Sequence, residues 1–172
     1  RESMFRKEFV EVISKTGMVP VKDLRPLLLD RNKLEVSEAK LLEYSFFDDV
    51  KFAKIVSEKY KLPFLDLSKA QVKDGTLALI KKKDAIKFRC VPIQKTAKAV
   101  TIAVYDPSIL NLRKEIQTLF QHNVELVLTN IASWLKLFTR IEESIDDLLD
   151  TVREIKADTE NEDAASIKNE DI

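Results

Sequence analysis

The apolar residues of the chain follow two different periods, and the change comes near residue 62. Before it, apolar side chains recur every three or four positions, which is the period of amphipathic helices. Pro63 disfavours a helical residue before it, so the helical part should end there. Residues 1–61 are therefore predicted to form a small helical bundle. We expect helices over 5–14, from Val19-Pro20 to Leu28, from an N-cap at Ser37 to Tyr44, and over 50–60.

After residue 62, short apolar runs rich in β-branched residues alternate with helical segments. We expect strands over 64–67, 90–93, 99–105 and 124–128, with Pro92 at a sheet edge. Helices are predicted over 76–80 and 84–88, after Asp106-Pro107-Ser108, and after Asn130. This order predicts that residues 62–142 form a compact α/β sandwich with helices on one side, so the fold class is α+β.

The last predicted helix carries a heptad spacing of apolar residues that is longer than a small sheet needs for cover. Its positions are Trp134, Phe138, Ile141, Ile145, Leu148, Val152 and Ile155. Two interpretations remain open. Residues 134–141 pack on the domain and the rest is an extension, or the helix docks a partner through Ile145, Leu148, Val152 and Ile155. We expect a helical extension over 143–156 and an acidic, disordered linker over 157–172.

The composition argues against several kinds of active site. The two glycines, Gly17 and Gly75, are too far apart for a phosphate-binding loop, which needs closely spaced glycines. With one histidine, His122, and one cysteine, Cys90, the chain cannot form a metal site that needs several histidines and cysteines. We therefore expect that this chain is not an enzyme, and we predict no catalytic residue, cofactor or metal.

Charge and hydropathy limit the classes of partner and the cellular compartment that we expect for the chain. A formal net charge of zero argues against nucleic acid. The basic residues of 81–98 form either a patch for an acidic partner or a solvated face. The adjacent carboxylates Asp48 and Asp49 should point apart and indicate solvated surface. No apolar run approaches the roughly 20 residues that span a bilayer, and no signal-peptide core occurs, so we expect a cytoplasmic location.

Four stretches of the chain resemble one known family. In order and spacing, KLPFLDL, FRCVPI, AVTIAVYDPSILN and VELVLTN are similar to the MshEN-type N-terminal domain of type II secretion and type IV pilus assembly ATPases. The family's Leu-Pro-Phe seam falls on Leu62–Leu67, its Val-Pro strand on Val91-Pro92, and its Asp-Pro strand end on Asp106-Pro107. The resemblance covers residues 5–142.

The resemblance implies a non-catalytic regulatory or docking module at the front of a larger ATPase. The implied partners are the chain's own motor domain and the inner-membrane platform protein of a bacterial secretion or pilus machine, which would place the chain peripherally at that membrane. A stand-alone oligomerising adaptor is an alternative from another class.

Members of this family can bind cyclic di-GMP through two tandem motifs that open with Arg-Leu-Gly, contain a central glycine and close near a glutamine. The first motif falls on Glu8-Phe9-Val10, with Gly17 as the central glycine and Arg31 at the glutamine position. The second falls on Val36-Ser37-Glu38, with Ser45 in place of the central glycine.

Most of the motif residues are missing. A glutamate is repulsive where an arginine should meet an anionic ligand, and Arg25, in a shifted register, is followed by Pro-Leu instead of Leu-Gly. The resemblance therefore argues against cyclic di-GMP binding in the family manner. The alternative function is a cyclic di-GMP sensor with a modified site, for which Gly17, Arg25 and Arg31 are the candidate ligand residues.

Overall fold

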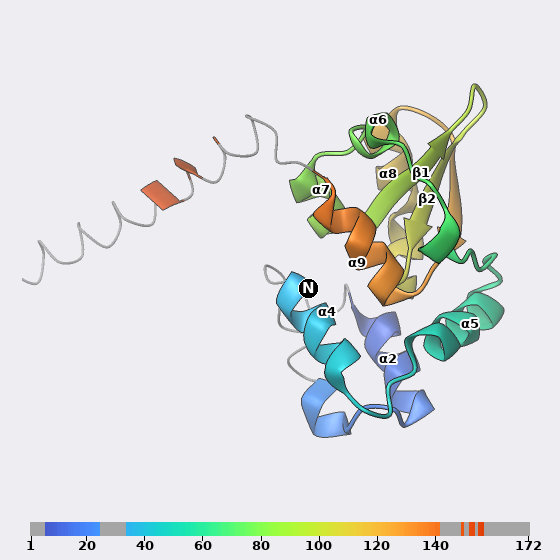
Figure 1. The fold of residues 1–172 in the computed structure, drawn as a ribbon, viewed down its shortest axis with the longest axis vertical. Helices are drawn as coiled ribbons and strands as arrows, with labels where there is room; N and C mark the ends of the chain where they lie inside the picture. The colour runs from blue at the N-terminus through green and yellow to red at the C-terminus, as the bar shows by residue number, and fades with distance from the viewer. Residues whose placement is uncertain (1–5, 25–33, 142–148, 150–151, 154, 157–172) are drawn as a thin grey trace, which may run out of the picture.

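The computed structural model describes residues 6–24 and 34–141, together with 149, 152, 153, 155 and 156. The first part of the chain is helical, as predicted, with α2 (Lys7–Thr16), α4 (Leu34–Glu43) and α5 (Asp49–Tyr60); residues 21–24 are also helical. Figure 1 shows these helices gathered beside one end of the sheet. The rest of the predicted helix, residues 25–28, lies outside the described residues.

Local chemistry sets the helix ends. α2 stops at Gly17, which has a φ of 70°, a left-handed conformation that glycine adopts without strain. The Asp48 side chain caps α5 by accepting the Lys51 N–H at 3.0 Å. Phe47, just before this cap, packs on Phe52 with ring centroids 5.4 Å apart and fixes the entry of the helix. The predicted N-cap at Ser37 is wrong, because α4 already begins at Leu34.

Within the described residues, the sheet has three strands in the order β1 (Cys90–Lys95), β2 (Val100–Val104) and β3 (Val124–Leu128). β1 and β2 are antiparallel, with an irregularity between Pro92 and Gln94, whereas β2 and β3 are parallel. Pro92 lies on an edge strand, as predicted. A parallel pair needs a crossover, which η2 (Pro107–Leu112) and α8 (Arg113–Phe120) provide.

The predicted strand over 64–67 is wrong. Phe64 forms one isolated parallel bridge with Leu128, and the chain then turns into η1 (Leu67–Lys69). The turn follows from Asp66, whose carboxylate accepts the Ser68 N–H at 3.0 Å and diverts the backbone from the sheet.

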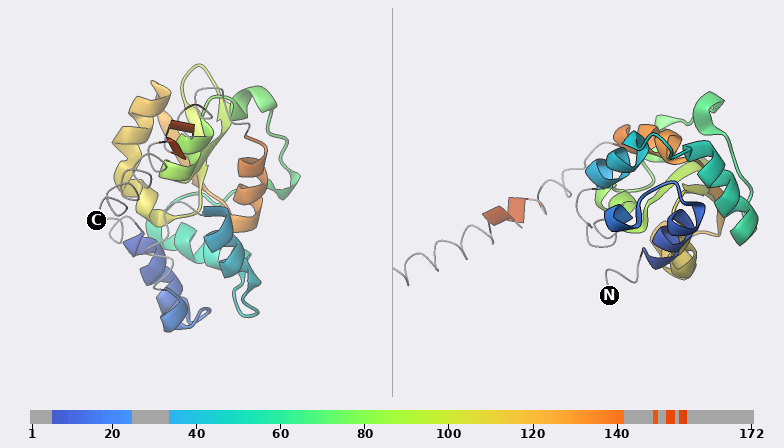
Figure 2. Two further views of the ribbon diagram at one scale, coloured as in Figure 1. Left: turned by 90° about the vertical axis from the view of Figure 1, so that its left-hand side faces the viewer. Right: turned by 90° about the horizontal axis from the view of Figure 1, so that it is seen from below.

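Helices lie on both faces of the sheet, which corrects the expectation of a single covered side. Figure 2 (left) shows α8 on one face and α9 (Ile131–Thr139) on the other. Consecutive residues of β2 are accordingly buried, including Ile102 and Ala103 at 0 % exposure. α6 (Asp74–Leu77) and α7 (Lys82–Phe88) precede β1 and pack on it. The α+β class is confirmed.

A chain of aromatic rings joins the helical part to the sheet and α9. Trp134 of α9 stacks on Phe138 at 5.3 Å and meets Tyr105 edge-on at 4.9 Å. Tyr105 contacts Phe9 of α2 at 5.9 Å, and Phe9 contacts Phe52 of α5 at 5.8 Å. The two predicted subdomains therefore share one continuous hydrophobic core.

Candidate functional site

The junction of the two subdomains contains a buried ion cluster centred on Arg6. The Arg6 side chain is 2 % exposed, and its Nη2 atom lies 3.0 and 2.9 Å from the two carboxylate oxygens of Glu38 in α4. Its Nε atom donates to Asp106 Oδ2 at 3.4 Å, and its guanidinium lies 4.6 Å from the Phe9 ring centroid. One cation thus joins α4 to Asp106, the second residue after β2.

The electrostatics of this cluster favour permanent charge on Arg6. Burial acts against the charged guanidinium, but the Glu38 and Asp106 carboxylates outweigh it and raise the pKa of Arg6. Burial raises the pKa of Asp106, and Arg6 and Arg89 counteract part of that rise. Burial is also the main cause that raises the pKa of Tyr105. Arg6, Glu38 and Asp106 bind one another, so the arrangement supports structural coupling.

Asp106 also organises the backbone around the cluster. Its Oδ1 atom accepts the Ser108 N–H at 2.8 Å and begins η2. The Ser108 hydroxyl in turn accepts the Phe9 N–H at 3.4 Å. The Asp-Pro pair of the family resemblance therefore holds the start of α2 through side-chain and backbone bonds.

A second carboxylate, Asp49, joins the subdomains at the start of α9. Its oxygens accept the Asn130 side-chain amide at 2.8 Å and the backbone N–H groups of Ile131 and Ala132 at 2.8 and 2.9 Å. α9 has no side-chain cap from its own N-cap residue, so a residue of α5 supplies that function. The expectation that Asp49 is merely solvated surface is wrong, whereas Asp48 is exposed as expected.

Of the residues that the family resemblance assigned to a ligand, the structure describes Glu8, Gly17 and Glu38, and the first two lie at opposite ends of α2. Glu8 is half-buried and accepts the Asn111 side-chain amide at 3.0 Å. Gly17 is exposed at the other end of α2 and donates its N–H to the Ser14 carbonyl at 3.3 Å. Glu38 is fully buried against Arg6. Arg25 and Arg31 lie outside the described residues.

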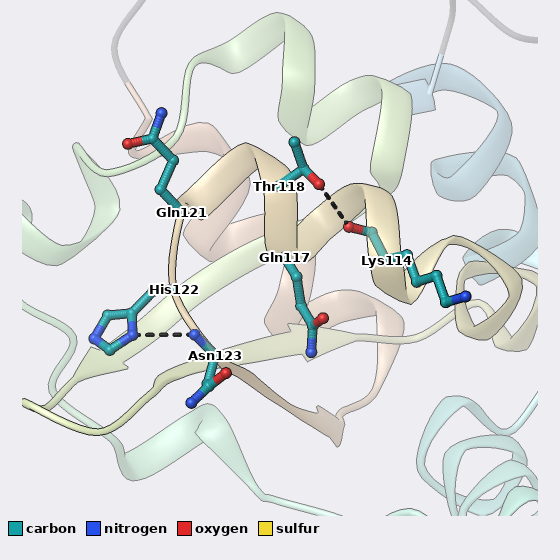
Figure 3. A pocket seen from close by; sticks show the side chains of 6 residues that line it. All are labelled: Lys114, Gln117, Thr118, Gln121, His122 and Asn123. Atoms are coloured by element: carbon teal, nitrogen blue, oxygen red, sulfur yellow. Dashed lines mark hydrogen bonds between the residues drawn. The ribbon is translucent and has the colours of Figure 1, made fainter.

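A shallow polar hollow at the end of α8 offers a different candidate (Figure 3). His122 lies there, where its Nδ1 atom accepts the Asn123 N–H at 3.0 Å and its Nε2 atom lies 3.3 Å from the Thr96 carbonyl oxygen. These two contacts fit a neutral imidazole that donates from Nε2. The other lining residues are Lys114, Gln117, Thr118 and Gln121. The Thr118 hydroxyl donates to the Lys114 carbonyl oxygen at 3.1 Å and is not paired with a base, so we make no catalytic assignment for the hollow.

The predicted heptad positions divide into two groups. Trp134, Phe138 and Ile141 are buried on the domain, whereas Val152 and Ile155 are 59 % and 61 % exposed. Ile145 and Leu148 lie outside the described residues, so a role of this seam in partner binding stays a prediction. Across the residues that the structure describes, no His, Cys, Asp and Glu cluster suits a metal ion, and no helix has the length and apolarity to cross a bilayer.

Comparison with known proteins agrees with the resemblance in the sequence. The MshEN domain family matches residues 60–148, which is more than half of the chain. The chain belongs to the MshEN domain family. The match begins at Tyr60, the last residue of α5, so the family's matched span is the α+β part of the fold with its C-terminal continuation.

Individual relatives of this MshEN domain include a pilus assembly ATPase. The type IV pilus assembly ATPase PilB of Myxococcus xanthus (strain DK1622) is 22 % identical over 161 residues, which cover 88 % of this chain but only 28 % of PilB. A structure of MshE with cdg covers 77 % of this chain and 97 % of its own, with 20 % identity and a TM-score of 0.50. The N-terminal domain of XpsE covers 81 % and 96 %, with 15 % identity and a TM-score of 0.50. These two structures share the fold.

Removing the Asp49 carboxylate should loosen the contact between α5 and α9. We expect Asp49→Ala to lower the free energy of unfolding by about 2 kcal/mol, because three donors lose a charged acceptor. Urea unfolding followed by fluorescence of the single tryptophan, Trp134, measures this loss. Asp48→Ala is the matched control, since it removes only a cap within α5 and should cost about 1 kcal/mol. Equal losses for the two variants would contradict a joining role for Asp49.

Removing Arg6 should leave two buried carboxylates without their shared cation. We expect Arg6→Met to cost about 3 kcal/mol, and the double variant Arg6→Met, Glu38→Leu to be more stable than Arg6→Met alone. Lys7→Met, an exposed neighbour with the same change in charge, should stay within about 0.5 kcal/mol of the parent. Chemical denaturation of the four proteins tests this ranking.

The loss caused by Arg6→Met should also depend on pH. Because burial raises the pKa of Asp106 in the folded chain, folding favours the protonated carboxyl, and the stability contributed by this group falls as the pH rises above its unfolded pKa. Arg6 opposes that fall by favouring the carboxylate. The loss should therefore be larger near neutral pH than near about pH 4.5, where protonation of Asp106 makes the missing cation less costly. A pH-independent loss would argue against this coupling.

Proposed function

We propose that the chain is the non-catalytic N-terminal docking and regulatory module of a bacterial secretion or pilus assembly ATPase. It acts through protein–protein contacts with the inner-membrane platform of that machine and with its own motor domain. Two findings support the inference that the chain is part of such an ATPase: its family membership and its similarity to PilB, of which it spans about 28 %.

One observation supports a role without a nucleotide ligand: at two positions of the family's ligand motifs, the side chains bind other residues of this chain. Glu8 stands where the first motif would have its arginine, and its half-buried carboxylate is bonded to Asn111. Glu38 stands at the glycine of the second motif and is 0 % exposed in its contact with Arg6. A dianionic ligand at these positions would meet two acidic side chains, one of which the fold already requires.

The helical part offers an apolar surface for the proposed docking. In the loop between α4 and α5, Phe47 is buried, whereas its neighbour Phe46 is 84 % exposed. Val50, in the first turn of α5, is 43 % exposed. An aromatic side chain that the core does not use is typical of residues that dominate the affinity of protein interfaces. We assign this surface, together with the heptad residues Ile145, Leu148, Val152 and Ile155, to the cytosolic domain of the platform protein.

A docking role of Phe46 predicts a selective loss of affinity. The test is calorimetric titration of the chain with the purified cytosolic domain of the platform protein encoded in the same genome. We expect Phe46→Ser to weaken binding by about tenfold or more, because a buried aromatic contact is worth at least about 1.4 kcal/mol. Leu79→Ser, at a 39 % exposed residue of the α+β part, is the control and should bind as the parent does. Binding that neither substitution weakens would reject this surface.

The alternative function, a cyclic di-GMP sensor, is favoured by one observation: the MshE structure of the same fold was solved with cdg. Titration of this chain with cyclic di-GMP, with GTP and ATP as references, separates the two functions. We expect no saturable heat up to roughly 100 μM ligand, an affinity too weak for a second-messenger sensor. Saturable micromolar binding that Arg25→Ala or Arg31→Ala abolishes would establish the sensor and overturn the non-ligand role.

A further inference from the structure

The zero net charge of the chain hides a strong separation of charge along it. Residues 142–172 contain 12 acidic and 3 basic residues, which give this segment a net charge of −9. Residues 1–141 therefore carry a net charge of +9. Such an asymmetry between two parts of one chain gives each part a field of opposite sign.

The structure divides the lysines of 81–98 into two separate groups. Lys95 and Lys98 belong to the connection between β1 and β2, at the end of the sheet far from α7 (Figures 1 and 2). Arg89 is 3 % exposed and belongs to the interior. The remaining four lie on or just before α7 and define the basic face: Lys81, Lys82, Lys83 and Lys87. Asp84 is the only acidic residue of α7.

The last described residues before the acidic segment lie beside this basic face. The Lys82 ammonium lies 5.2 Å from the ring centroid of Phe138, near the end of α9. Arg140 then fixes the exit of the chain by donating to the Val72 carbonyl at 2.6 Å and to Asp74 at 2.9 Å. Ile141 is buried, and Glu142 and Glu143 follow it directly.

We propose that the acidic segment 142–172 binds the basic face of α7 within the same chain. The charges are complementary, and the attachment at Ile141 gives the segment an effective concentration on the order of millimolar at that face. The contact is electrostatic and lies at the surface, so it should weaken as salt shortens the Debye length from about 10 Å at 0.1 M. It does not depend on the proposed docking function.

Paramagnetic relaxation enhancement on the full chain tests the proposal. A nitroxide label is placed at Ala157→Cys; the native Cys90 is buried, and burial raises the pKa of its thiol, so the label goes to the new cysteine. We expect loss of amide signal intensity along α7 and little loss at the β1–β2 connection. The loss should vanish at about 1 M NaCl, where the Debye length is about 3 Å. Signal loss that is uniform, insensitive to salt or greatest at Lys98 would overturn the proposal.

Two groups of charge variants make the test specific. Lys81→Gln, Lys83→Gln and Lys87→Gln together should abolish the signal loss, whereas the control pair Lys95→Gln and Lys98→Gln should leave it unchanged. Equal effects of the two sets would contradict the assignment to α7. A mixture of ¹⁵N-labelled chain with spin-labelled, unlabelled chain identifies the occupant. Signal loss in that mixture would show that a second copy covers the face, and would overturn binding within one chain.

Discussion

The fold depends on one buried positive charge that needs partners from two parts of the chain. A guanidinium in the protein interior is stable only if carboxylates replace the water that it has lost. Arg6 obtains one carboxylate from α4 and the other from Asp106, the second residue after β2. The helical part and the sheet must therefore lie against each other for this charge to be satisfied. Phe9, in the next turn of α2, then lies against Tyr105 and Phe52 and extends the contact into the aromatic core.

Asp49 joins the same two parts by a different mechanism. It accepts the N–H groups at the start of α9, where the helix dipole favours negative charge. Its three hydrogen bonds are directional and constrain the orientation of α9, whereas the aromatic contacts constrain mainly the distance between the elements. The two carboxylate contacts lie at different places along the junction, so together they limit how far the helices of the N-terminal part can tilt relative to α9. In this MshEN domain, the Arg6 ion pairs and the Asp49 hydrogen bonds both join the helical part to the α+β part.

The sequence was informative wherever a local pattern determined the structure. The β-branched run before Asp106 predicted the central strand, and Pro63 predicted the end of α5. Local pattern did not predict the structure where contacts with residues distant in the chain determine it. Phe64 and Leu65 have the composition of a strand, but Asp66 turns the backbone after a single bridge. The roles of Arg6 and Asp49 depend on contacts with residues 100 and up to 83 positions away, which no local spacing encodes. A buried arginine close to a chain end leaves no signal that distinguishes it from a surface arginine.

The separation of 100 residues between Arg6 and Asp106 has a consequence for synthesis on the ribosome. Arg6 and Glu38 emerge early, and this pair can form while the rest of the chain is still being made. Asp106, Ser108 and the sheet that carries them arrive later, at roughly 5–20 residues per second. For several seconds the nascent helices expose the apolar surface around Phe9 that the sheet later covers. The final packing of these helices is therefore set only after Asp106 and Ser108, which follow β2, have been translated.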